Sequence, residues 1–379
     1  FATTTAIAAT NVTQTDGVPL SYWWFRNSTG NLDGEAKDND TGDPGSVRWD
    51  DSSLVITVSG IVYSDAGTTV QAGGMCDDVT NVITIVVENG ATYNGSCSSA
   101  DGSYSIGGVV VVGDPTLTIY VNGVASTYGA IITKTPTADI VDADIYLNRV
   151  IVRHEDVSAM TIADMAVYDS SDDADLRFTA ATSTLTDTLT TYVQTELYVW
   201  ASSTFTPGGS VTLQADSSAN VYDGSLYIAG DATFTAAGTT TYTIGGSFTQ
   251  ATGASFVPAS STVLFTATTT GKTVTAAAAE IITFNEVQFT GVGGAWNINA
   301  DLSLADDLLV SAGTVTGTGD ITLLNGSFYG DGLVSLGGGV TTIAKSNTLG
   351  GVQGWTFNDL TLGTGSVVGT TTPGSNATT

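Results

Sequence analysis

The second half of the chain consists of short segments in which apolar residues alternate with small or polar ones. From residue 226 onward a glycine or asparagine interrupts the alternation every six to ten residues, as in LLVSAGTVTGTGDITLLNGSFYGDGLVSLGGG (308–339). A period of two places one set of side chains on one face of a strand, and glycine allows the positive φ values of tight corners. The pattern predicts a right-handed parallel β-solenoid over residues 226–379. Tandem small β-sandwiches are the alternative, because alternation alone does not separate the two folds.

Two stretches of this region recur in the same order. TFNEVQFTG (283–291) returns as TFNDLTLGTG (356–365), and GSFTQATGASF (246–256) precedes the first copy as GSFYGDGLVSL (326–336) precedes the second. Repetition of a supersecondary unit is typical of stacked architectures. We interpret these repeats as scaffold rather than as a motif for chemistry.

The whole chain is predicted to be all-β. Val, Ile, Thr and Tyr are frequent, whereas the helix formers Glu, Lys, Arg and Leu are scarce, and only 12% of residues are charged. We divide the chain into an N-terminal strand with an Asp- and aromatic-rich segment (1–51), a β-sandwich (52–135), a β-rich connecting domain (136–225) and the repeat domain (226–379).

Residues 54–123 carry the pattern of the sandwich, with strands of five to seven residues between Gly, Asn and Asp turns. The order VSGIVYSDAG, DGSYSI, LTIYVNG resembles the carboxypeptidase-regulatory-like sandwiches of bacterial surface proteins. YLNRVIVRHED, LYVWASSTFTPGGSVT and FTATTTGKTV, further along, are similar to segments of repeat-rich secreted bacterial proteins. The resemblance covers most of residues 52–300 and implies exposure on a cell surface or in a matrix.

The net charge of the chain indicates which kinds of partner it can bind. Nine basic residues stand against 37 acidic ones, giving a net charge of −28. Such a surface repels nucleic acid and anionic membranes, since phosphate binding needs Lys or Arg. It would attract divalent cations, although acidity also serves simply to keep a Thr-rich β protein soluble. No apolar run approaches the roughly 20 residues of a membrane span.

The expected compartment is extracellular. The sequence begins with Phe1 rather than Met, from which we infer a removed leader. The two cysteines, Cys76 and Cys97, are predicted to form a disulfide worth about 3 kcal/mol for a loop of this size. A metal site built on them would need histidine, and the sole histidine is His154.

Two Asp-rich stretches are candidate calcium loops. Ca²⁺ takes six to eight oxygen ligands from flexible loops, and both stretches place carboxylates among small residues. Solvated acidic loops are the alternative interpretation, and Ca²⁺ would act as a structural ion. The first cluster contains Asp33, Glu35, Asp38, Asp40 and Asp43, and the second contains Asp169, Asp172, Asp173 and Asp175.

The aromatic run Tyr22, Trp23, Trp24 and Phe25 is a candidate subunit or glycan contact, because alternate side chains of a strand cannot all face one core. Burial against the sandwich is the alternative. Candidate glycosylation acceptors in N-x-S/T sequons are Asn11, Asn27, Asn39, Asn94, Asn325 and Asn376.

Catalytic groups are sparse, so we predict that the chain is not an enzyme. No G-x-S-x-G elbow accompanies His154, whose strand is expected to hold Arg149, Ile151 and Arg153 on one face. Arg153 and Glu155 are expected to pair. The carboxylates of Asp301, Asp306, Asp307 and Asp320 would suit a hydrolase if they faced one groove, but aspartate is also the ordinary residue of a solenoid corner.

The leading hypothesis is an extracellular structural protein, the repeating subunit of a bacterial cell-surface filament or sheath. Copies of the chain would join through β-strand edges, which we expect at both ends of the chain because a solenoid end that is not capped invites the next subunit. The N-terminal ATTTAIAATNVTQT could lie as an added strand on a neighbour. A monomeric adhesin or glycan-binding surface protein is the alternative. A Ca-dependent polysaccharide lyase or hydrolase is the third hypothesis.

Overall fold

The structure is a computed structural model that describes residues 54–363, except positions 89, 216–219, 221, 346 and 347, together with the backbone of short strands outside that range. Residues 1–53 and 54–379 form two compact units. In the first unit, β1 (Val12–Thr13), β2 (Tyr22–Phe25) and β3 (Ser46–Arg48) form an antiparallel sheet with β2 in the middle.

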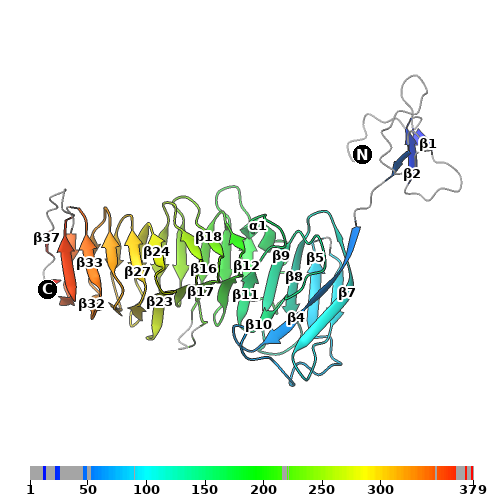
Figure 1. Ribbon diagram of the computed structural model, residues 1–379, viewed down its shortest axis with the longest axis horizontal. Helices are drawn as coiled ribbons and strands as arrows, with labels where there is room; N and C mark the ends of the chain where they lie inside the picture. Colours follow the sequence, from blue (N-terminus) through cyan, green and yellow to red (C-terminus); the bar gives the residue numbers. More distant parts are fainter. Residues whose placement is uncertain are drawn as a thin grey trace. The chain divides into compact units, whose positions relative to one another are not determined.

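The second unit begins with a β-sandwich, as predicted (Figure 1). One layer has the strand order β10 (Ile145–Tyr146), β4 (Ser53–Tyr63), β7 (Ser103–Val112). The facing layer has the order β6 (Thr92–Gly95), β5 (Ile83–Val87), β8 (Thr116–Val121), β9 (Ala130–Lys134), all antiparallel. Apolar side chains of both layers, among them Val58, Ile85 and Val109, form one core.

Beyond the sandwich the chain forms a parallel β-solenoid of about 11 turns over residues 130–362. Complete coils have three strands, one on each of three faces (Figure 1). The first face continues from β9 through β11 (Arg149–Val152), β14 (Glu196–Val199), β17 (Leu226–Ile228), β20 (Phe248–Gln250), β23 (Lys272–Ala276), β26 (Ala295–Ile298), β29 (Thr314–Gly317), β32 (Leu333–Leu336), β35 (Trp355–Thr356) and β38 (Ala377–Thr378).

The other two faces follow the same order along the solenoid. The second face consists of β15 (Thr204–Phe205), β18 (Thr233–Thr235) and β21 (Ser255–Val257), followed by a separate sheet of β24 (Ile281–Phe284), β27 (Asp301–Leu304), β30 (Ile321–Leu323), β33 (Val340–Ile343) and β36 (Asp359–Leu362). The third face consists of β12 (Phe178–Ala181), β13 (Thr188–Thr191), β16 (Ser210–Leu213), β19 (Thr241–Ile244), β22 (Thr262–Phe265), β25 (Glu286–Phe289), β28 (Leu308–Val310), β31 (Phe328–Tyr329), β34 (Thr348–Gly350) and β37 (Thr372–Pro373).

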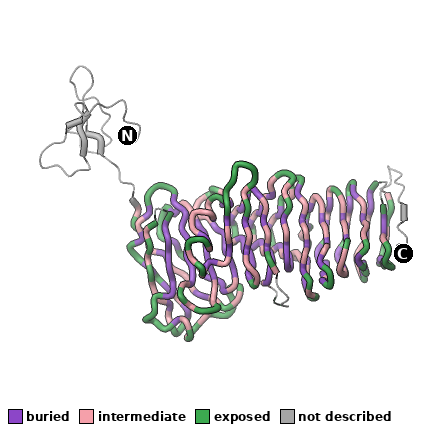
Figure 2. Tube along the Cα trace, turned by 180° about the vertical axis from the view of Figure 1, so that it is seen from behind, coloured by how far each residue is buried: buried purple, intermediate pink, exposed green. Residues whose placement is uncertain are grey.

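The alternation seen in the sequence is the inside–outside pattern of these strands. Figure 2 shows buried positions alternating with more exposed ones along every coil. The coil formed by β26, β27 and β28 turns six apolar side chains inward, two from each strand: Trp296, Ile298, Leu302, Leu304, Leu308 and Val310. In-register pairing places each of them above its counterpart, as in the series Trp296, Val315, Val334. Every coil therefore buries its core against the coils on either side.

The sandwich and the solenoid share one sheet. Strand β9 pairs antiparallel with β8 on one side and parallel with β11 on the other. In β11 the side chains of Val150 and Val152 enter the solenoid core, whereas Ile151 enters the sandwich core. The solenoid thus begins near residue 130, earlier than the predicted residue 226, because the strands of residues 136–225 already belong to its faces.

The solenoid does not end in an open coil on its N-terminal side. On the first face the stack continues into the antiparallel strands β8, β5 and β6, and on the third face β12 pairs antiparallel with β13. The short helix α1 (Ile162–Met165) packs beside β12, with Ile162 and Met165 in the solenoid core. Antiparallel pairing uses up the edges on which a further parallel coil would have formed.

Helix α1 was not predicted. Its N-cap Thr161 and Asp164 form a capping box, in which the side chain of each accepts a hydrogen bond from the backbone N–H of the other. The T-x-x-D pattern that signals this box is visible in the sequence. It is the only α-helix of the described residues, none of whose helices is long and apolar enough to span a membrane.

The repeated motifs of the sequence do not occupy equivalent positions in the coils. The first TFN motif leads from β24 on the second face to β25 on the third, whereas the second leads from β35 on the first face to β36 on the second. The GSF motifs shift in the same way, from β20 to β31. What recurs is a strand–corner–strand unit that fits more than one corner of the coil.

Some corners require glycine because the backbones of neighbouring coils lie in close contact there. A Cβ on Gly291, the last residue of TFNEVQFTG, would lie 1.8 Å from the carbonyl oxygen of Ala267 in the neighbouring coil. No rotamer change relieves this overlap, because both partners are backbone. At Gly337, by contrast, a Cβ would meet nothing within 4 Å, and the residue is exposed.

We therefore expect Gly291→Ala to destabilise the solenoid by about 1–3 kcal/mol, the usual cost of forcing atoms into a packed site. Gly337→Ala is the matched control and should stay within about 0.5 kcal/mol of the wild type. Urea unfolding followed by circular dichroism measures both. Equal stability of the two variants would show that Gly291 does not lie against the backbone of Ala267 in the neighbouring coil.

Candidate functional site

At the junction of sandwich and solenoid, a group of polar and aromatic side chains lies on the side of the first face that points away from the solenoid core. Arg149 of β11 and Glu196 of β14 are register partners there, and Arg149 Nε donates to Glu196 Oε2 at 2.6 Å. The two side chains are only 8% and 9% exposed. Arg149 Nη1 also donates to the carbonyl of Leu147 at 2.9 Å. Burial raises the pKa of Glu196, and the Arg149 guanidinium opposes that rise.

Beside this ion pair lies a group of rings that we call the outer aromatic cluster: Tyr63, Tyr146, Tyr198, Trp200 and Tyr227. Tyr198 and Tyr227 are register partners on β14 and β17 and stack with centroids 4.8 Å apart and planes 2° apart. Tyr146 of β10 meets Tyr198 edge-on at 5.4 Å and also contacts Trp200. The cluster forms the margin of the sandwich core, where the three-stranded layer ends at β10.

Arg153 fixes one side of this cluster. Its guanidinium lies 5.5 Å from the centroid of the Trp200 ring, and Nη1 donates to the carbonyl of Asp142 at 2.7 Å. Arg153 also pairs with Glu155, with Nε and Oε1 2.8 Å apart, as the sequence predicted. These contacts hold the guanidinium against the indole ring of Trp200.

The outer aromatic cluster has polar tips without protein partners. The hydroxyls of Tyr198 and Tyr227 and the indole N–H of Trp200 make no hydrogen bond to any residue that the structure describes, and none of them is fully buried. Tyr198 is 9% exposed, and Trp200 and Tyr227 are more exposed than that. Burial raises the pKa of Tyr198 and Tyr227, so both remain neutral at physiological pH.

The second predicted calcium loop is bound into the fold by its own carboxylates. Asp169 accepts from the backbone N–H groups of Ser171 and Ala180, each at 2.7 Å. Asp173 accepts from the hydroxyl of Tyr120 at 2.7 Å, and Asp175 from the N–H of Gly123 at 2.6 Å. Within the described part of the chain, no group of three or more His, Cys, Asp or Glu side chains is arranged to hold a metal ion. Calcium at Asp169, Asp172, Asp173 and Asp175 stays a prediction.

The solenoid aspartates occupy corners, where they bridge successive coils. Asp301 Oδ1 accepts from the N–H of Asp320 at 2.8 Å, and Asp320 Oδ1 accepts from the N–H of Val340 at 2.7 Å. Asp307 Oδ1 accepts from the N–H of Ser327 at 2.7 Å. These carboxylates satisfy backbone donors of the next coil. Asp306 lies beside Asp307, and burial together with the Asp307 carboxylate raises its pKa.

His154 is part of the packing between strands. Its Nε2 accepts a hydrogen bond from the N–H of Thr204 at 3.0 Å, which requires the neutral imidazole with the proton on Nδ1. The ring therefore joins the end of β11 to the start of β15.

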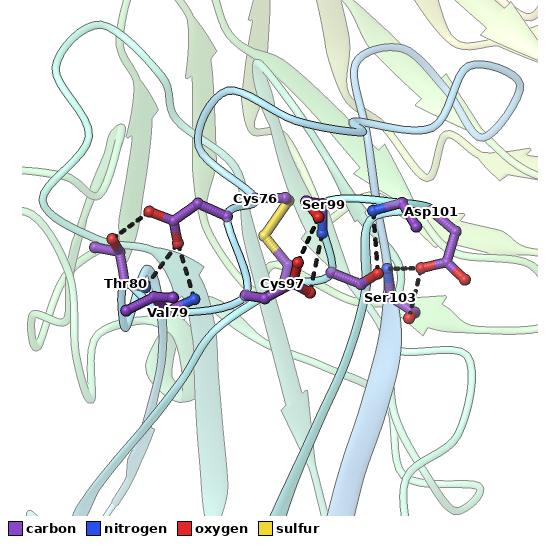
Figure 3. The surroundings of a disulfide bond; sticks show 11 residues. Cys76, Val79, Thr80, Cys97, Ser99, Asp101 and Ser103 are labelled. Carbon is purple, nitrogen blue, oxygen red and sulfur yellow. Dashed lines mark hydrogen bonds between the residues drawn. A yellow bond between two sulfur atoms is a disulfide. The ribbon is translucent and has the colours of Figure 1, made fainter.

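The predicted disulfide is present. Cys76 and Cys97 are joined and fully buried in the sandwich core (Figure 3). Short polar side chains hold the loops beside it, with Asp77 accepting from the N–H groups of Val79 and Thr80 and Asp101 from that of Ser103. The bridge closes a loop over β5 and β6, whose strands lie between the two cysteines.

Several predicted site residues lie outside the residues that the structure describes. These are the first calcium cluster, Asp33, Glu35, Asp38, Asp40 and Asp43, and the sequons at Asn11, Asn27, Asn39 and Asn376. The run Tyr22, Trp23, Trp24 and Phe25 forms β2, and its side chains lie outside the description.

Two sequons are described. Asn94 is exposed on β6, and its Oδ1 accepts from the hydroxyl of Thr84 at 2.8 Å. Asn325 is exposed at a corner, where its Nδ2 donates to the carbonyl of Ala305 and its Oδ1 accepts from Lys345. Glycosylation at either stays a prediction.

Comparisons with protein-family models, with curated proteins and with solved structures found no match to this chain.

Sequence reasoning missed the outer aromatic cluster. Its members come from four separated segments, and only the alternation in ELYVW (196–200) and LYI (226–228) indicated that Tyr198 and Tyr227 face outward. Their meeting with Tyr63 and Tyr146 depends on the sandwich, whose packing no local pattern encodes.

The ion pair yields a test of the junction. Arg149→Met leaves Glu196 buried without its cation, and we expect the unfolding free energy to fall by about 3–5 kcal/mol at neutral pH. Because the pKa of Glu196 is raised in the folded state, the folded chain holds this proton more tightly than the unfolded chain. The deficit should therefore be small below the ordinary carboxyl pKa and grow as pH rises through the raised value.

Urea unfolding at several pH values measures this dependence. The double variant Arg149→Met/Glu196→Leu removes both charges and should recover most of the stability, with little pH dependence left. A single variant as stable as the wild type at neutral pH would contradict a buried pair.

The disulfide yields a second test. Cys76→Ala/Cys97→Ala should lower the stability of the sandwich by about 3 kcal/mol, since the bridge closes a loop with a sequence separation of 21. Reduction of the wild type with dithiothreitol should reproduce the loss, whereas the double variant should not respond to it. A wild type that melts identically with and without reductant would argue against the bridge.

Proposed function

We propose that this chain is an extracellular structural protein, the repeating subunit of a bacterial cell-surface filament or sheath that assembles through β-strand edges. A disulfide in the sandwich core suits an oxidising compartment. A continuous apolar core along the solenoid suits a stiff element, because each coil is held by both neighbours.

One observation supports a specific joining edge. Strand β6 is the last strand of a 14-stranded sheet and pairs only with β5 on its inner side. Val87 N donates to the carbonyl of Ala91 at 2.9 Å, so by antiparallel alternation Thr92 and Asn94 direct their N–H and C=O groups away from β5. Both residues are exposed, and their outward N–H groups have no described partner.

An edge of this kind is a template for another strand. The proposed donor is the N-terminal segment of the next copy. It was predicted as ATTTAIAATNVTQT, and we shorten it to ATTTAIAATN because Val12 and Thr13 form β1. Addition of that strand to β6 would extend the sheet from one subunit to the next.

Electron microscopy of the native full-length protein, with and without EDTA, tests the proposal. We expect regular fibres, and their loss in EDTA would connect Asp33, Asp38 and Asp40 or the second Asp loop with assembly. Deletion of residues 1–11 should leave folded monomers. Discrete monomers of the wild type under both conditions would overturn the filament function.

A matched pair of variants isolates the acceptor edge. Thr92→Pro removes one outward N–H, and proline is tolerated on an edge strand where its N–H faces solvent. Thr92→Val keeps the donor and the strand preference. We expect fibres from Thr92→Val and few or none from Thr92→Pro, with equal melting temperatures. Normal fibres from both variants would exclude β6 as the acceptor.

A further inference from the structure

The outer aromatic cluster has features that neither the fold nor the filament requires. Tyr198 and Tyr227 stack face to face on the outward side of the first face, which leaves the other face of the Tyr227 ring turned toward β20. Trp200 lies at an angle beside Tyr198. Completion of a core explains buried rings, but it does not explain three polar tips left without a partner among the described residues.

The surface beside the rings continues with hydroxyl groups. The register partner of Tyr227 is Thr249 on β20, whose own partner is Thr275 on β23, and the two Oγ1 atoms lie 3.3 Å apart. Neighbouring strands lie about 4.8 Å apart. Flat rings and hydroxyl groups therefore follow one another along a single straight line across the sheet.

We propose that this line, from Tyr198 through Tyr227 to Thr249, with Trp200 beside Tyr198, binds a neutral polysaccharide. A pyranose ring has an apolar C–H face and a rim of hydroxyl groups. The C–H face suits the face of the Tyr227 ring that Tyr198 does not cover, and the rim suits the unpartnered hydroxyl and indole groups and the threonines.

The charges around the cluster select the class of sugar. Asp142, Asp144 and Asp65 lie close enough to Tyr63 that their carboxylates, together with burial, raise its pKa. The one guanidinium that contacts the cluster, that of Arg153, is already paired with Glu155. Uronic acids and sulfated sugars would be repelled by this surface and by a chain of net charge −28. An apolar partner would leave the polar tips unsatisfied.

Native affinity electrophoresis of the full chain tests the site. The gels contain galactomannan or hydroxyethyl cellulose as neutral probes, or polygalacturonate as the anionic comparison. We expect retardation by a neutral probe and none by polygalacturonate. Tyr227→Ala should weaken binding by about tenfold or more, since one stacking ring contributes on the order of 1 kcal/mol beyond its buried area.

Two further variants control for folding. Tyr227→Leu keeps apolar cover over Tyr198 but not the flat ring, so it should fold like the wild type and bind as weakly as Tyr227→Ala. Tyr329→Ala removes a partly exposed, outward tyrosine on β31 of the third face and should bind normally. Thr92→Pro should also bind normally, because the site does not depend on assembly.

Three outcomes would overturn the proposal. The first is a wild type retarded by neither neutral probe or only by polygalacturonate. The second is an equal effect of Tyr227→Leu and Tyr329→Ala. The third is a Tyr227→Leu variant that loses self-association while the wild type binds no polysaccharide, which would assign the rings to a contact between copies.

Discussion

The in-register hydrogen bonding between successive coils is the constraint on which the rest of the second unit depends. A single coil is a closed circuit of three short strands that cannot bury its own inward side chains. Phe248, Val274 and Ile298 become a core only because parallel pairing places them in one row. The same pairing aligns the outward side chains in rows, so the arrangement of residues on the surface follows from the register of the core.

Register also decides where the chain tolerates variation. Coil lengths differ widely, since 19 residues separate the partners Ile298 and Gly317 whereas 29 separate Leu197 and Leu226. The additional residues are accommodated between strands, at corners, and the strand partners stay aligned. A corner can lengthen at little cost when its ends are fixed, but a strand that gained one residue would turn its core side outward.

This division explains how much could be predicted from the sequence. Alternation and glycine placement are local, so the solenoid and the sandwich were both expected, and Cys76 and Cys97 paired as predicted. The start of the solenoid was missed because strands such as β11 are buried on both sides. There Val150 and Ile151 enter different cores, and RVIV shows no alternation to detect. The aromatic cluster was missed for a related reason, since its rings meet only where two cores share one sheet.

Some of the aspartates that make this chain acidic have a structural role. Asp301, Asp307 and Asp320 each accept a hydrogen bond from a backbone N–H of the following coil. Asp169 accepts two, one from Ser171 in its own loop and one from Ala180 in β12. Parallel coils present N–H groups at corners that no strand partner can satisfy, and a short carboxylate side chain reaches them better than any neutral residue. Each coil that repeats such a corner adds an aspartate whose role is to accept this hydrogen bond. Negative charge is therefore not by itself an indication of calcium in a chain of this architecture. A metal ion would instead be held by carboxylates that accept no hydrogen bond from a backbone N–H.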